Sequence, residues 1–310
     1  MNRLLESPLS GIIPPLVTPL LNNDMLDIKG LECLIEHLID GGVHALFILG
    51  TTGEAQCLSY RLRQEMIRET CRITAGRLPV LVCISDTSIV ESIRLSQIAA
   101  DYGAEAGVSA PPYYFASAQP ELVEFYEQLV EALPLPLFLY NMPTHTKVNF
   151  APQTIRRIAE NPKVIGFKDS SANLVYFQSV MYVMSDRHDF SMLVGPEEVT
   201  GESVLMGGNG GINGGANMFP ELYVKLYNAA KEHNFEELYR IQKIIMQISA
   251  TIYTIGKYGS SYLKGLKCAL SLLGICNDFV AAPFNHFEKV EREQVRKALD
   301  SLNMNLDLKP

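Results

Sequence analysis

The stretch VIGFKD, residues 164–169, places a short apolar run directly before a lysine and an aspartate. Short apolar runs rich in β-branched residues are typical of strands buried on both faces of a parallel sheet. Seven further runs occur in the 310-residue chain: GIIPPLVTP (from Gly11), VHALFILG (Val43), PVLVCIS (Pro79), AGVSAPP (Ala106), PLFLYN (Pro136), FSMLVG (Phe190) and GGNGGING (Gly207). Together the runs predict eight strands.

Longer stretches with helical periodicity separate most of these runs. In them apolar residues recur every three or four positions and leave a charged opposite face, as in residues 27–40, 60–75, 91–103 and 121–133. Alternation of strand and helix indicates an α/β protein, and eight repeats favour a closed (β/α)8 TIM barrel. A doubly wound sheet is the alternative.

Beyond Pro220 the pattern is wholly helical. Helices are expected in residues 221–233, 235–253, 260–274 and 292–302. The first of them would complete the barrel. We therefore predict a catalytic barrel domain over residues 1–230 and a C-terminal helical extension, or appendage, over residues 231–310.

Composition excludes several classes of protein. The chain is 47% apolar and 19% charged with a formal net charge of −8, which fits a globular protein with a large core and disfavours nucleic acid as a partner. Glu6, Pro8, Pro14 and Pro15 interrupt the N-terminal apolar residues, so neither a signal peptide nor a membrane span is predicted. The cysteines form no CxxC pair and the histidines no HExxH motif, which predicts reduced thiols in the cytoplasm and no metal site.

In a barrel of this kind the chemistry lies where the strands end. Lys168 follows an apolar run, so its amine would lose part of its hydration, which favours the neutral, nucleophilic form that attacks carbonyl groups. Tyr140 ends the preceding strand and could move protons for Schiff-base chemistry. The plainer alternatives are a solvated Lys168–Asp169 pair and a core tyrosine.

Other polar residues would meet on the same rim. The GTTG turn brings Thr51 and Thr52, and the seventh strand is followed by Gly195, Glu197 and Glu198. The threonines could equally form only a tight turn, and the glutamates could simply begin a helix, where carboxylates favour the N-terminal dipole.

Five motifs carry a resemblance to a known family. GTTGE (from Gly50), PPYY (Pro111), YNMP (Tyr140), GFKD (Gly166) and GGNGGI (Gly207) resemble the dihydrodipicolinate synthase / N-acetylneuraminate lyase family of pyruvate-dependent class I aldolases. The resemblance runs from about Gly11 into the C-terminal helices. It implies a lyase on a TIM barrel, without cofactor or metal, that assembles as a homotetramer built from tight dimers.

The resemblance also implies catalytic roles. Lys168 would form the imine with pyruvate or another 2-oxo acid, and Tyr140 would be the acid and base beside it. Thr51 and Tyr114 would complete a proton relay, with Tyr114 reaching in from a neighbouring subunit. Thr51 and Thr52 would hold the substrate carboxylate through hydroxyls and backbone N–H groups.

Further residues are expected to bind substrate. The carbonyl of Ile212 would lie close to the lysine, and Gly195 would line the site. The pair Glu197 and Glu198 is similar to the acidic residues that sugar-acid lyases use to accept hydrogen bonds from hydroxyls.

Two positions depart from the family patterns. His145 stands where dihydrodipicolinate synthases carry an arginine for the carboxylate of the aldehyde, and imidazole cannot make the forked contact of a guanidinium. Gly214 replaces the serine of sialic acid lyases. We therefore predict an aldolase for a 2-keto-3-deoxy sugar acid or a related 4-hydroxy-2-oxo acid.

Other functions stay open. The alternative enzyme is dihydrodipicolinate (4-hydroxy-tetrahydrodipicolinate) synthase, which condenses pyruvate with aspartate semialdehyde, and a dehydratase could use the same imine. A non-catalytic sugar-acid binding barrel and a phosphate-binding isomerase are rivals of other classes.

The stretch GGNGGINGGAN, residues 207–217, contains no G-x-G-x-x-G or G-x-x-x-x-G-K-[ST] signature and no basic residue. A phosphate cradle is therefore disfavoured. Its glycines are expected to let the backbone approach a ligand closely, or else to make a tight bend where the barrel closes.

Overall fold

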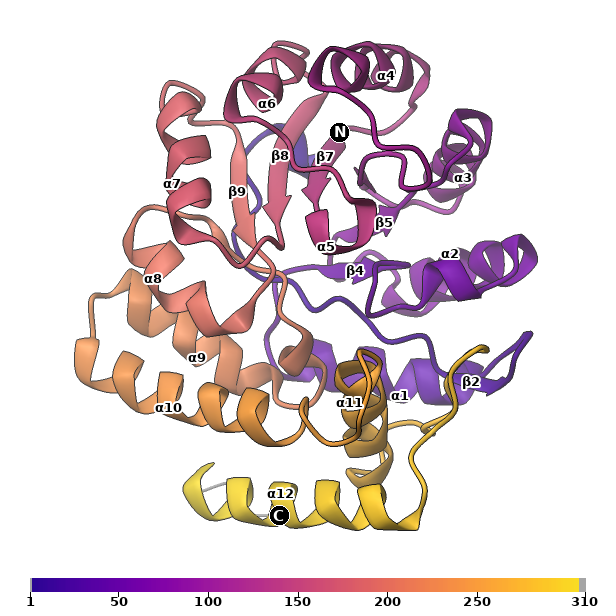
Figure 1. Cartoon of the computed structure of the whole chain (residues 1–310), viewed down its shortest axis with the longest axis vertical. Helices are drawn as coiled ribbons and strands as arrows, with labels where there is room; N and C mark the ends of the chain where they lie inside the picture. The colour runs from indigo at the N-terminus through magenta and orange to yellow at the C-terminus, as the bar shows by residue number, and fades with distance from the viewer. Residues whose placement is uncertain (1, 307–310) are drawn as a thin grey trace.

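A closed parallel barrel forms the centre of the computed structural model, which describes residues 2–306 (Figure 1). The eight-stranded sheet has the order β1 (Gly11–Ile12), β10 (Gly210–Gly211), β9 (Ser191–Val194), β8 (Val164–Asp169), β7 (Leu137–Asn141), β6 (Ala106–Ser109), β5 (Val80–Cys83) and β4 (Leu46–Ile48). A parallel bridge between Pro15 and Phe47 joins the segment after β1 to β4. The predicted TIM barrel is therefore confirmed, and the doubly wound alternative is wrong.

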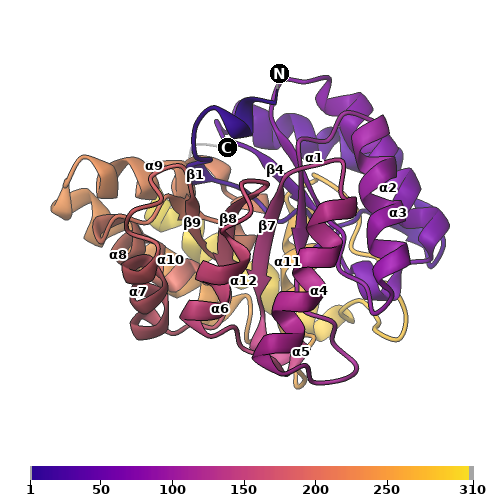
Figure 2. The ribbon, with the colours of Figure 1, turned by 90° about the horizontal axis from the view of Figure 1, so that it is seen from above.

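Helices cover the outside of the barrel (Figure 2). They are α1 (Ile28–Asp40), α2 (Tyr60–Thr74), α3 (Ile89–Asp101), α4 (Gln119–Ala132), α6 (Pro152–Ile158), α7 (Leu174–Val183), α8 (Thr200–Leu205) and α9 (Pro220–Lys231). Every residue of the strands from β4 to β9 is buried, because helices cover one face of the sheet and packed side chains fill the other. The side chains of Asp27, Ser59 and Asn173 cap α1, α2 and α7.

The C-terminal helices are α10 (Phe235–Thr251), α11 (Ser261–Leu272) and α12 (Lys289–Leu306), which lie together along one side of the barrel (Figure 1). The boundary expected at residues 230/231 falls at the end of α9, and the division into two domains stays a prediction. Within residues 2–306 no helix has the length and apolar character needed to cross a membrane.

Some short elements were not expected from the sequence. A hairpin of β2 (Leu20–Asn22) and β3 (Met25–Leu26) precedes α1, and α5 (Pro143–Thr146) follows β7. Four 3-10 turns complete the described chain: η1 (Arg3–Leu5), η2 (Ala55–Cys57), η3 (Glu197–Val199) and η4 (Gly214–Asn217). Each is too short to produce a hydrophobic period in the sequence. Of these, η3 leads directly into α8, in line with the alternative that Glu197 and Glu198 begin a helix.

The first part of the glycine stretch makes the seam of the barrel. Gly210 pairs with Gly11 in neighbouring strands and has a φ of +148°. A Cβ at Gly210 would lie 1.9 Å from the carbonyl oxygen of Gly11, so no other residue fits at this close approach. The interpretation of these glycines as a tight closure is confirmed for Gly210.

Candidate active site

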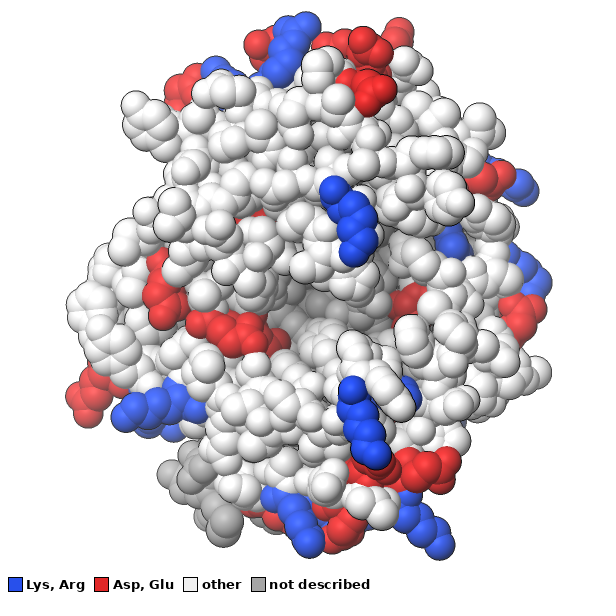
Figure 3. Space-filling model, in the orientation of Figure 1, with Lys and Arg blue, Asp and Glu red and all other residues white. Residues whose placement is uncertain are grey.

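A cavity of about 990 Å³ opens at the carboxyl ends of the strands. The face seen in Figure 3 is hollowed at its centre, and acidic side chains lie beside the hollow. Nearly all predicted site residues line this cavity: Thr51, Thr52, Tyr140, His145, Lys168, Gly195, Glu197, Glu198 and Ile212.

Lys168 and Tyr140 lie side by side on β8 and β7. Their Cα atoms are register partners in neighbouring parallel strands, so both side chains point to the inside of the barrel. Lys168 is only 4% exposed, and its Nζ lies 4.1 Å from the centre of the Tyr140 ring and 4.7 Å from that of Phe47. The lysine thus reaches the cavity along two aromatic walls.

Asp169 points to the other face of β8. Its carboxylate accepts hydrogen bonds from Asn141 Nδ2 at 2.9 Å and from Ser171 Oγ at 2.7 Å, and burial raises its pKa. In the described part of the chain Lys168 takes part in no ion pair. The alternative of a solvated Lys168–Asp169 pair is therefore wrong.

The GTTGE turn brings two threonine hydroxyls into the cavity. Thr51 Oγ1 lies 3.3 Å from the Tyr140 hydroxyl, a distance at which a proton can pass between them. Thr52 lies beside it and is 6% exposed. Glu54 ends the motif in the left-handed conformation (φ +58°) and anchors the turn through an ion pair with the fully buried Lys267, at 2.5 Å.

Tyr114 does not reach the cavity of its own chain. Its side chain is 82% exposed and contacts only the ring of the neighbouring Phe115 among the described aromatic contacts, with 5.1 Å between ring centres. Tyr113 lines the cavity instead. The role of Tyr114 in a neighbouring subunit stays a prediction.

Glu197 lines the cavity wall, but its carboxylate is directed into the protein. Oε1 accepts hydrogen bonds from the hydroxyls of Tyr223 at 2.5 Å and Tyr253 at 2.9 Å, and Oε2 accepts one from the Gly215 backbone N–H at 2.8 Å. Burial raises the pKa of Glu197 to about 7. Because these donors occupy both oxygens, the expected role of Glu197 as an acceptor for substrate hydroxyls is weakened.

Glu198 is also engaged by the C-terminal helices. Its Oε1 accepts a hydrogen bond from Ser249 Oγ, and its backbone carbonyl accepts one from Gln242 Nε2 at 2.7 Å. Glu198 lines the cavity, and its carboxylate has more acceptor sites than this one donor uses.

His145 lies on α5 at the mouth of the cavity. Protein atoms displace water from part of its ring and, together with Lys147, lower the pKa of His145. The imidazole is therefore neutral near pH 7. In the described lining of the cavity Lys168 is the only lysine or arginine.

The family of the chain follows from comparison with known proteins. Residues 8–302 match the dihydrodipicolinate synthetase family. The chain belongs to this family. The predicted family membership and lyase class are thereby confirmed.

Relatives within the dihydrodipicolinate synthetase family carry the names of different enzymes. A probable 2-dehydro-3-deoxy-D-pentonate aldolase of Escherichia coli (strain K12) is 34% identical over 86% of this chain and 88% of its own. A solved structure of dihydrodipicolinate synthase from Bacteroides thetaiotaomicron is 75% identical, with a TM-score of 0.94 over 95% of this chain and 99% of that one. A prophage protein of this family from E. coli K12, solved with pyruvate, is 28% identical, with a TM-score of 0.91 over 96% and 99%.

One wall of the cavity in this dihydrodipicolinate synthetase family member was not expected from the sequence. The same cavity as that of Lys168 is lined by Tyr253 and Tyr258, which lie between α10 and α11, and by Tyr262 in the first turn of α11. The recurrence of tyrosines at a break between two predicted helices was the signal that could have found them.

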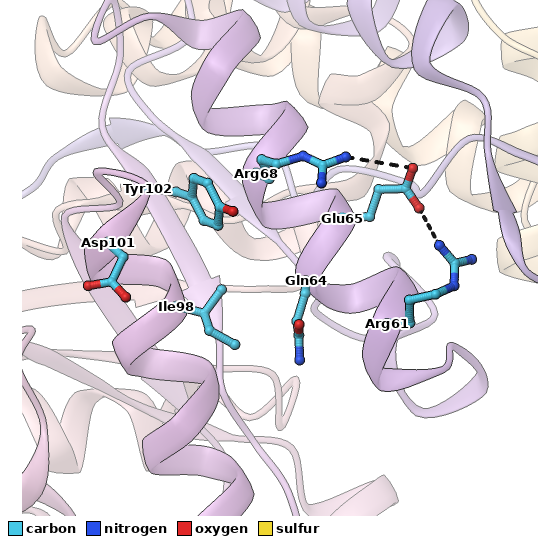
Figure 4. A pocket seen from close by; sticks show the side chains of 7 residues that line it. All are labelled: Arg61, Gln64, Glu65, Arg68, Ile98, Asp101 and Tyr102. Atoms are coloured by element: carbon cyan, nitrogen blue, oxygen red, sulfur yellow. Dashed lines mark hydrogen bonds and ion pairs between the residues drawn. The ribbon is translucent and has the colours of Figure 1, made fainter.

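A second hollow of about 390 Å³ lies between α2 and α3 (Figure 4). Glu65 lies between Arg61 and Arg68, with separations of 2.8 and 4.0 Å between charged atoms. Because its arginines are already paired, this hollow offers no free cation to a ligand.

Proposed function

We propose that the enzyme forms an imine between Lys168 and the keto carbon of a 2-oxo acid, and that it cleaves or forms a bond between pyruvate and an aldehyde. The position of Lys168 supports this proposal: the amine is buried against Tyr140 and Phe47, without a carboxylate partner in the described chain. The pyruvate bound to the related prophage protein supports it independently.

The chemistry needs one nucleophile and one proton carrier. The Nζ lone pair attacks the keto carbon, and the resulting carbinolamine loses its hydroxyl as water when Tyr140 supplies a proton. In the cleavage direction the bond between C3 and C4 then breaks, its electrons move into the iminium to give an enamine, and the C4 hydroxyl proton passes to Tyr140. The aldehyde leaves, the enamine takes a proton at C3, and water releases pyruvate from the lysine.

Thr51 and Thr52 are proposed to support these steps. Thr51 Oγ1, at 3.3 Å from the Tyr140 hydroxyl, can pass protons to and from it. Both threonines, with the Ile212 carbonyl and Gly195 nearby in the lining, would hold the 2-oxo acid. We also propose the assembly expected from the sequence, a homotetramer in which the exposed Tyr114 enters the cavity of a neighbour, and a cytoplasmic location in keeping with the free cysteines.

A 2-keto-3-deoxy sugar acid, or a related 4-hydroxy-2-oxo acid, fits the described cavity. Such a substrate carries one carboxylate, and beyond Lys168 the described lining contains no lysine or arginine to pair with a second one. The neutral His145 suits hydroxyl groups. The alternative is dihydrodipicolinate synthase, which the 75% identical Bacteroides structure favours.

Two measurements test this function. Sodium borohydride with pyruvate should fix a covalent adduct on Lys168, visible as a mass gain that Lys168→Ala abolishes. Absence of an adduct, under conditions that trap a reference aldolase, would refute the imine. Turnover of a panel of 2-keto-3-deoxy acids beside aspartate semialdehyde then identifies the aldehyde, and a strong preference for the semialdehyde would decide for the alternative.

A further inference from the structure

Tyr262 enters the cavity through the space left by Gly214. A Cβ at Gly214 would lie 1.8 Å from the Tyr262 hydroxyl oxygen, closer than any two such atoms can approach. The φ of Gly214 is outside the left-handed region, so its backbone would accept another residue. The absence of a side chain at Gly214 therefore makes room for the Tyr262 hydroxyl and is not required by the backbone conformation of the turn.

The hydroxyl of Tyr262 contacts the threonine pair. Tyr262 Oη lies 3.2 Å from Thr52 Oγ1, and burial raises the pKa of this tyrosine, which keeps its hydroxyl proton in place. A threonine hydroxyl has one hydrogen to donate and lone pairs to accept with. If Tyr262 donates to a lone pair, the Thr52 hydrogen is left for another acceptor.

Neighbouring groups hold Tyr262 in this position. Its ring meets that of Tyr253 edge to face, with 4.7 Å between centres, and the Tyr253 hydroxyl donates to the buried Glu197. A Cβ at Gly215 would lie 1.9 Å from the Tyr223 hydroxyl and 2.8 Å from that of Tyr253. Gly214 and Gly215 thus admit three tyrosines, which the Glu197 carboxylate helps to fix.

We propose that Tyr262 is a positioning residue for the 2-oxo acid: by donating to Thr52 Oγ1, it directs the Thr52 hydroxyl hydrogen toward the substrate carboxylate. The proposal rests on the proposed function, since it assigns the carboxylate to this end of the cavity. It makes the C-terminal helices part of substrate recognition. Tyr262 acts on binding and leaves the chemistry at Lys168 unchanged.

The variant Tyr262→Phe tests whether Tyr262 affects substrate binding without affecting the chemistry at Lys168. The pyruvate concentration that gives half-maximal borohydride trapping should rise about three- to tenfold, as expected for loss of one hydrogen bond, while trapping at saturation and kcat stay near the wild-type values. Tyr239→Phe, on the exposed surface of α10, is the matched control and should change neither. An unchanged half-saturation in Tyr262→Phe, with the wild type trapped normally, would overturn the inference and leave the proposed function standing. No trapping in the wild type would overturn both.

Gly214→Ala gives a second, independent test. The new methyl group should displace the Tyr262 hydroxyl and raise the half-saturating pyruvate concentration to a similar degree. Both changes remove the same contact. The half-saturating pyruvate concentration of the double variant should therefore be no higher than that of the more affected single variant. Multiplied effects in the double variant, or a Gly214→Ala enzyme with wild-type half-saturation, would refute the assignment of Gly214 to Tyr262. Thermal midpoints of all variants show whether each is folded.

Discussion

Replacement of Lys267 by methionine should strongly destabilise the protein. Lys267 is fully buried, and its Nζ donates to Glu54 Oε1 at 2.5 Å and to the Thr18 carbonyl oxygen at 2.8 Å. Methionine retains the apolar stem and removes the ammonium. Glu54 would keep only the backbone N–H of Ala281, at 2.8 Å from its Oε2, as a partner among its described contacts.

The expected magnitude follows from the loss of charge balance. Removing one partner of a buried ion pair leaves an uncompensated charge and typically costs about 3–5 kcal/mol of the free energy of unfolding. For a chain of this size each kcal/mol lowers the thermal midpoint by roughly 2–4 °C, so a fall of at least about 6 °C is expected. Because Glu54 anchors the turn that carries Thr51 and Thr52, the half-saturating pyruvate concentration should rise as well.

Differential scanning calorimetry at one protein concentration and one scan rate measures this effect. The double variant Glu54→Leu/Lys267→Met is the matched control, because it removes both charges and should recover much of the loss. A single variant with a midpoint within about 2 °C of the wild type would refute the reasoning, since the pair would then contribute little. A double variant no more stable than the single one would show that packing, and not charge, was lost.

Three further predictions concern other parts of the fold. The pKa of Glu197 is about 7 in the folded protein, whereas its ordinary value is 4.5. The unfolded chain therefore loses the Glu197 proton at a lower pH than the folded protein does. The free energy of unfolding should fall as the pH rises from about 4.5 to about 7. Glu197→Gln should flatten this fall in a series of thermal midpoints, and an unchanged slope would argue against it. Gly210→Ala should prevent closure of the barrel seam and lower the thermal midpoint by far more than Gly42→Ala. Gly42 is the control because it also has a positive φ, but no atom lies within 4 Å of its Cβ position. Similar falls in the midpoint for the two variants would contradict the steric argument. His145→Arg should increase turnover of aldehydes with a second carboxylate relative to neutral ones, and an unaltered ratio would remove His145 from specificity.

The barrel and the position of the lysine proposed as nucleophile were predictable because their signals are local. Each buried strand is a short apolar run, and Lys168 and Tyr140 stand at the ends of two such runs that pair in register. The helices of the C-terminal part were also expected from their periodicity. The hairpin before α1 and helix α5 were not, since neither spans a full hydrophobic period.

Contacts between distant parts of the chain could not be predicted from the sequence. The Tyr262–Thr52 contact joins residues 210 positions apart, and it depends on how α11 packs against the barrel. The engagement of Glu197 by Tyr223 and Tyr253 depends on the packing of α9 and of the end of α10 against the barrel. Read alone, the glutamate pair suggested a surface for substrate hydroxyls, whereas three-dimensional packing directs the first carboxylate inward.

The long separation between Glu54 and Lys267, 213 positions, has a consequence for synthesis on the ribosome. A nascent chain that has emerged as far as Lys168 already carries the amine and its tyrosine, but the anchor of the threonine turn is still untranslated. Until α11 leaves the exit tunnel, the Glu54 carboxylate lacks its ammonium partner, and only contacts from earlier segments, such as the hydrogen bond from Thr18 Oγ1 to the Gly53 carbonyl, hold the turn. The complete pocket is therefore a late product of translation, and a chain arrested before α11 would hold Lys168 in an unfinished site.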